Sequence, residues 1–140
     1  MVGILITGHG IFAEGIGSSL EVIIGEQAQL AKVNFLKEDS TETLKEKIIK
    51  GIEEVDTGDG VMIFADLVGG SPFKVAAMLS LEKGNIEVLG GTNIQSIMEI
   101  AFMREIPLKE LAKKADQAAQ NAAQLFELKV KEEMEEEEGI

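Results

Sequence analysis

The segment GVMIFADLVGGSP, residues 60–72, is the most informative about the fold because it joins an apolar strand to the start of a helix. Val61–Ala65 is apolar throughout, which is typical of a strand in a parallel sheet that is covered on both faces. The two glycines after it suit a tight turn, Ser71 is a natural N-cap, and Pro72 suits the first helical position. The stretch therefore predicts a strand, a turn and a helix of an α/β protein.

The same strand–helix unit recurs on both sides of this stretch. Short apolar strands are expected at residues 2–7, 29–35, 61–65 and 85–89. Apolar residues three and four apart predict helices at 12–23, 41–55, 72–81, 94–101 and 107–119. Ser40 or Thr41 and Asn93 are the expected caps. The alternation predicts an open, mostly parallel four-stranded sheet with helices on both faces.

The C-terminal segment follows a different pattern. Phe126, Leu128 and Val130 alternate with charged residues, which predicts a half-buried strand at 125–130. The glutamate-rich residues 131–140 predict a solvated, disordered tail. We therefore expect one domain over residues 1–130, followed by this acidic tail.

Composition excludes several classes of function. The chain has 140 residues and no cysteine. Its formal net charge of -12 makes nucleic acid and anionic membranes improbable partners, because both are negatively charged. The apolar run at residues 1–6 is too short for a signal peptide or a membrane span, and it has no basic flank. A cytoplasmic protein without membrane insertion is expected.

Candidate functional residues follow the first and third predicted strands. Sites in parallel sheets form beyond the carboxyl ends of the strands, where the strand order reverses. His9, the single histidine, stands there between two glycines, and Asp66 follows the third strand. If these strands are neighbours, His9 and Asp66 face each other across the sheet edge.

These residues form a coherent chemical set. A neutral imidazole is a good nucleophile near pH 7, and a carboxylate on its other nitrogen fixes the tautomer. Gly69, Gly70 and Ser71 open a helix whose N–H groups and dipole favour an anion. The set predicts phosphoryl transfer, with His9 as acceptor, Asp66 as the residue that orients the ring, and a phosphate cradle at residues 69–71.

Structural interpretations of the same residues stay open. Asp66 can be a turn residue and Ser71 a helix start only. Lys74 and Arg104 are candidate phosphate ligands, but solvated surface positions are expected for both. Residues 8–13 also fit the dinucleotide fingerprint G-x-G-x-x-A; the match is weak because the second strand lacks an acid at its end and the imidazole crowds a pyrophosphate.

Three segments resemble one known family. Gly8–Gly10, Phe64–Phe73 and Gly90–Asn93 are similar to segments of the enzyme IIA components in the mannose family of the bacterial sugar phosphotransferase system. The Asp-Leu-x-Gly-Gly-Ser-Pro-Phe block is the specific part, and the resemblance covers roughly residues 1–130. It implies a phosphotransferase that needs neither a metal nor an organic cofactor.

The resemblance also implies partners and roles. His9 matches the histidine that takes a phosphoryl group from HPr and gives it to a IIB component, here expected on a separate chain. Asp66 matches the acid that hydrogen-bonds the imidazole, and Ser71 with nearby amides matches the phosphate pocket. The family further implies a homodimer that exchanges a C-terminal strand, for which 125–130 is the candidate; the same strand can also fold back on its own sheet.

Rival functions share parts of this pattern. The nearest is a phosphocarrier subunit that serves a dihydroxyacetone kinase. A rival of another class is a regulatory module that reports sugar flux through binding partners and transfers nothing onward from His9.

Overall fold

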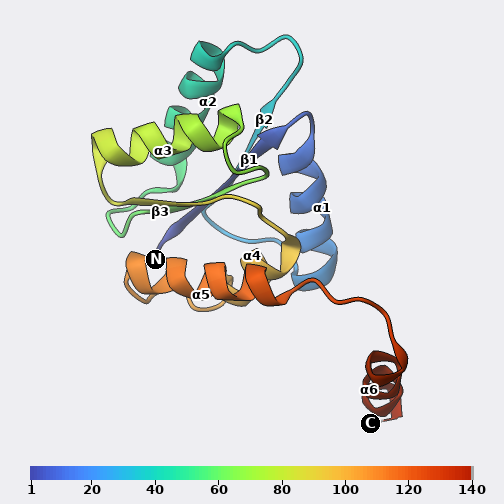
Figure 1. Ribbon diagram of the computed structural model, residues 1–140. Helices are drawn as coiled ribbons and strands as arrows, with labels where there is room; N and C mark the ends of the chain where they lie inside the picture. The colour runs from blue at the N-terminus through green and yellow to red at the C-terminus, as the bar shows by residue number, and fades with distance from the viewer. Residues whose placement is uncertain (140) are drawn as a thin grey trace.

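The computed structural model describes residues 1–139, with the side chains of 1–128 and 132–137, and shows alternating strands and helices (Figure 1). In chain order the elements are β1 (Gly3–His9), α1 (Phe12–Ile24), β2 (Leu30–Phe35), α2 (Thr41–Val55), β3 (Val61–Ala65), α3 (Ser71–Lys83), β4 (Ile86–Leu89), α4 (Ile94–Ile100), α5 (Leu108–Asn121) and α6 (Leu128–Gly139). The predicted four-strand α/β core is confirmed.

The strands form one parallel sheet in the order β2-β1-β3-β4. β1 lies between β2 and β3, so Thr7 has Val33 as its register partner on one side and Ala65 on the other. The chain first adds β2 on one side of β1 and then crosses to the other side for β3. The strand order therefore reverses between β1 and β3, as expected for a binding crevice in this class of sheet.

Two apolar layers cover the sheet. On one face, α2 and α3 pack over residues such as Leu5 and Ile63. On the other face, α1, α4 and α5 pack over Ile6 and Phe64 (Figure 1). Burial on both faces explains why β3 is apolar at every position. No helix within residues 1–139 has the length and apolarity that a membrane span requires.

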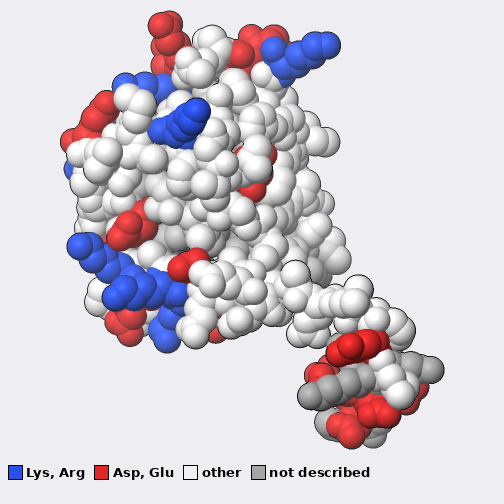
Figure 2. All heavy atoms as spheres, in the orientation of Figure 1, with Lys and Arg blue, Asp and Glu red and all other residues white. Residues whose placement is uncertain are grey.

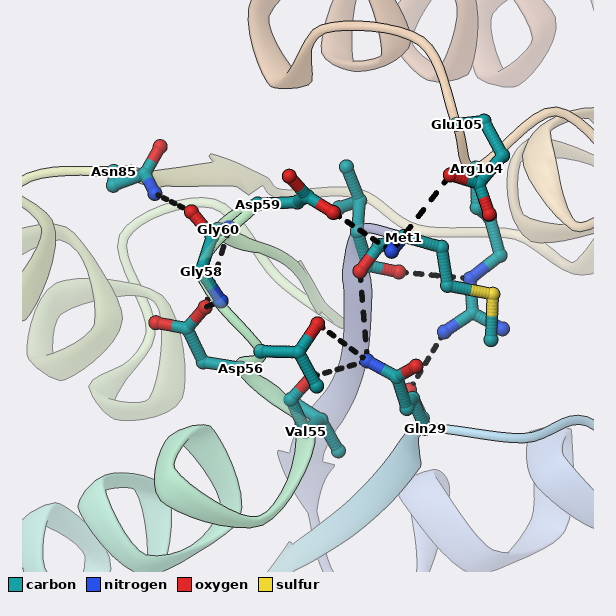
Figure 3. A network of polar contacts seen from close by, with 12 residues as sticks. Met1, Gln29, Val55, Asp56, Gly58, Asp59, Gly60, Asn85, Arg104 and Glu105 are labelled. Carbon is teal, nitrogen blue, oxygen red and sulfur yellow. Dashed lines mark hydrogen bonds and ion pairs between the residues drawn. The ribbon is translucent and has the colours of Figure 1, made fainter.

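Arg104 closes the end of the sheet where the strands begin. Its side chain is only 4% exposed, so the expected surface position is wrong. The guanidinium donates to the carbonyl oxygens of Val2, Ala28 and Gln29 at 2.9, 2.6 and 2.8 Å (Figure 3). These carbonyls converge where two strands begin, and the planar fork of donors satisfies all of them.

Helix starts agree with the sequence at two positions and differ at a third. The side chains of Ser40 and Asn93 cap α2 and α4 as expected, each accepting a hydrogen bond from the backbone N–H three residues on. Ser71 is not an N-cap: Gly70 holds that position, and Ser71 is the first helical residue. The Ser71 hydroxyl is thus not used to cap α3.

The single chain forms no strand at residues 125–130, and the exchange of such a strand between two subunits stays a prediction. Residues 122–127 have no regular structure, α6 begins at Leu128, and no fifth strand joins the sheet among residues 1–139. The tail, which was expected to be disordered, is helical through Gly139. Figure 1 draws this helix, α6, apart from the sheet. Glutamate and lysine are good helix formers. A segment of alternating apolar and charged residues is not stable as an extended strand unless it pairs with the edge of a sheet.

Candidate functional site

The end of β1 holds His9 at the carboxyl edge of the sheet. Gly10 follows with φ +60, a conformation that favours glycine, and its N–H donates to the Phe35 carbonyl at 2.7 Å. This bond ties the turn after β1 to the end of β2. The His9 side chain stays 47% exposed, so the ring is held by the sheet and remains accessible.

Asp66 follows β3 and reaches His9 across the switch point, as the sequence predicts. Its Oδ2 lies 2.8 Å from His9 Nδ1 and accepts the His9 backbone N–H at 2.9 Å. An ionised carboxylate only accepts hydrogen bonds, so in the neutral imidazole Nδ1 carries the proton and Nε2 keeps its lone pair. The Asp66 side chain is 15% exposed, so the carboxylate is largely buried while the His9 ring stays open to solvent. Asp66 thus contacts Nδ1 and leaves Nε2 on the open side of the pair.

The loop between β3 and α3 passes directly beside the imidazole. Gly69 has φ +84, and a Cβ added at Gly70 would lie 2.8 Å from His9 Cε1 and 3.6 Å from Nε2. Any side chain at Gly70 would therefore displace the ring or cover its free nitrogen. Ser71 begins α3 next to this contact, and the first N–H groups of a helix have no intrahelical partner. The arrangement suits an anion bound beside Nε2.

The segment Gly90–Asn93 has structural contacts. Thr92 donates its N–H to the Ala65 carbonyl at 3.1 Å, and Asn93 caps α4 while donating to the Ala119 carbonyl at 3.0 Å. Lys74 is exposed on α3. Neither Asn93 nor Lys74 shows a contact with His9.

Phe35 is a site neighbour that sequence reasoning placed only in a strand. Its ring meets the His9 ring edge to face, with centroids 5.7 Å apart and planes at 66°. Phe35 and His9 are register partners in the β1–β2 ladder. No local pattern signals this contact, because it depends on which residues two separate strands bring side by side.

The surroundings of the site are apolar as well as accessible. Ile11, Leu67 and Val68, in the turns after β1 and β3, are 65%, 58% and 64% exposed. Figure 2 shows charged side chains gathered along the upper rim and near α5, with a broad, largely uncharged surface between them. Apolar side chains exposed around a reactive group are typical of a surface that receives a protein.

Comparison with known proteins gives a consistent result. A family model described as the PTS system fructose IIA component (EIIA-man) matches residues 3–120. The mannose-specific EIIAB component of Escherichia coli is 34% identical over 104 residues, which is 74% of this chain and 32% of that protein. This chain thus spans about a third of the length of that relative.

Two further proteins match over most of their length. The fructose-specific EIIA component of Bacillus subtilis is 29% identical over 126 residues, covering 89% of this chain and 86% of that protein. A crystal structure of phosphotransferase system component EIIA from Streptococcus agalactiae superposes with a TM-score of 0.83 at 30% identity, covering 90% of this chain and 98% of the other.

Proposed function

Since this chain belongs to the EIIA-man family of sugar phosphotransferase system components, we propose that His9 accepts a phosphoryl group from HPr and passes it to a IIB component. In this proposal the protein is a histidine phosphotransferase that works in the cytoplasm during sugar import. The hydrogen bond from His9 Nδ1 to Asp66 Oδ2 is the observation that carries the proposal, since it leaves Nε2 free to react.

The reaction is a displacement at phosphorus. Nε2 of His9 forms the new N–P bond while the N–P bond to the donor histidine breaks, and the donor ring keeps the electron pair. The phosphorylated imidazole, still protonated at Nδ1, is positively charged, and the Asp66 carboxylate stabilises that charge. A IIB component then receives the group by the same chemistry in reverse.

The loop and the start of α3 supply the phosphate cradle of the proposal. Gly69 and Gly70 bring the backbone next to the ring, and the N-terminus of α3 favours negative charge. The Ser71 hydroxyl, which does not cap its helix, is a donor for a phosphate oxygen. Positioning and charge stabilisation are the main contributions that a protein makes to phosphoryl transfer.

The proposal includes a homodimer. β4 ends the sheet with one unpaired edge, beside a groove of about 540 Å³ that Val88, Leu89 and Lys113 help to line. Leu125 and Phe126 are 86% and 68% exposed, and a second copy offers a place to bury them. We therefore place the segment 124–130 of each chain in the subunit contact, with the two His9 sites separate.

Labelling tests the phosphoryl acceptor. Incubation with enzyme I, HPr and phosphoenolpyruvate is expected to add one acid-labile phosphate per chain, and none to a folded His9→Ala variant. Label on that variant would refute the assignment. Onward transfer to a IIB component, but not to a dihydroxyacetone kinase system, separates the proposal from its nearest rival. Retention of the label with no transfer to either acceptor would favour a regulatory module.

A further inference from the structure

Phe35 contacts the catalytic turn in two ways. Its carbonyl accepts the Gly10 N–H at 2.7 Å, and its ring packs edge to face on the His9 ring at 5.7 Å between centroids. The first contact holds the backbone of Gly10, the residue after His9. The second contact is made with the imidazole itself. Any residue at position 35 supplies the carbonyl, so the ring contact is what distinguishes phenylalanine there.

The other contacts leave the imidazole incompletely fixed. Asp66 holds the ring at Nδ1, and the Gly70 backbone lies beside Cε1. A single hydrogen bond allows the ring to rock about the bonded atom, and the His9 side chain is 47% exposed. Phe35 is the aromatic neighbour of this ring, so it supplies the contact that limits rocking.

We infer that Phe35 is a positioning residue, whose ring holds the His9 imidazole so that Nε2 points to the incoming phosphoryl group. The inference rests on the proposed function. Small errors in the placement of a nucleophile slow a reaction strongly, because in-line attack tolerates little misalignment.

A core role for Phe35 is the competing interpretation, since Phe35 also packs against the apolar layer under α2. Ile49 is partly buried and packs against the same layer, so Ile49→Ala is the matched control for lost packing. Phe35→Leu removes the ring and keeps an apolar side chain, whereas Phe35→Tyr keeps the ring. Comparing the three variants separates the effect of losing the aromatic contact with His9 from the effect of lowering the stability of the fold.

Two measurements test the inference. The first is the rate of phosphoryl uptake from phosphorylated HPr, corrected for the folded fraction found by thermal unfolding. The second is the NMR signal of the imidazole, which is unambiguous because His9 is the only histidine. It reports ring orientation and tautomer even in a protein that takes up no phosphate, so failure of the proposed function and failure of the inference are distinguishable.

Phe35→Leu is expected to slow uptake about tenfold or more and to shift the imidazole signals. Ile49→Ala is expected to lower the unfolding temperature with little effect on either measurement, and Phe35→Tyr to keep at least half of the wild-type rate. The inference is overturned if Phe35→Leu transfers within twofold of Ile49→Ala, if its imidazole signals match those of the wild type, or if Phe35→Tyr is as slow as Phe35→Leu.

Discussion

At the scale of single residues, the Asp66 carboxylate is expected to control the rate of transfer. Asp66→Asn keeps the shape of the side chain but removes the charge that selects the Nδ1–H tautomer and stabilises the charged ring. Phosphoryl uptake should fall by about a hundredfold or more while the fold is retained. Rapid-quench kinetics and circular dichroism measure the two quantities. A wild-type rate would make Asp66 a turn residue only.

Arg104 acts on stability at the opposite end of the sheet. Arg104→Met removes a donor from the carbonyls of Val2, Ala28 and Gln29. The Gln29 carbonyl keeps the Ile4 N–H as a donor, so the cost falls on Val2 and Ala28, because unpaired buried acceptors are costly. The free energy of unfolding should fall by about 2–3 kcal/mol, as measured by urea denaturation. Transfer by the folded fraction should be unchanged, because Arg104 does not contact the site. A loss below about 0.5 kcal/mol, the size of an ordinary surface substitution, would contradict this account.

At the scale of elements, the turn between β2 and α2 depends on one ionised carboxyl. Lys47 Nζ lies 2.7 Å from Asp39 Oδ2, and this contact, with the Leu36 N–H next, lowers the pKa of Asp39 below its usual value. A lowered pKa stabilises the fold at pH values above the ordinary aspartate pKa of about 3.9. The stabilisation is lost as pH falls through the lower pKa of the folded state.

Asp39→Asn should therefore be less stable than the wild type at neutral pH and nearly equal to it in strong acid. Thermal unfolding of both proteins from pH 7 down to about pH 2.5 measures the difference. A gap in unfolding temperature that stays constant over this range would show that the Asp39 charge is not what stabilises the turn.

At the scale of the whole molecule, the prediction concerns assembly. Light scattering should give a dimer for the full chain and for a chain that ends at Val130, because both keep the segment 124–130. A chain that ends at Ala123 loses the exposed Leu125 and Phe126 and should be monomeric. The chain that ends at Val130 is the control, because it keeps the segment 124–130 and lacks the acidic residues after it. A monomeric full chain at micromolar concentration, or a dimer of the shortest chain, would refute the contact.

The repeating strand–helix units, and the sheet edge that carries His9 and Asp66, can be predicted from the sequence alone. Apolar periodicity, the glycines at 69–70 and the caps at Ser40 and Asn93 act within a few residues, so they can be read locally. His9 ends β1 and Asp66 follows β3, and the sequence predicts their meeting because the carboxyl ends of parallel strands share one edge.

Which distant groups meet depends on the tertiary structure. Phe35 reaches His9 through strand register, and Arg104 is buried because three carbonyls converge on it; neither fact has a local signal. The alternating residues 125–130 form no strand in the single chain, because extension is stable only beside a sheet edge. Local pattern states what a segment is able to form, and the partners available in space decide what it forms.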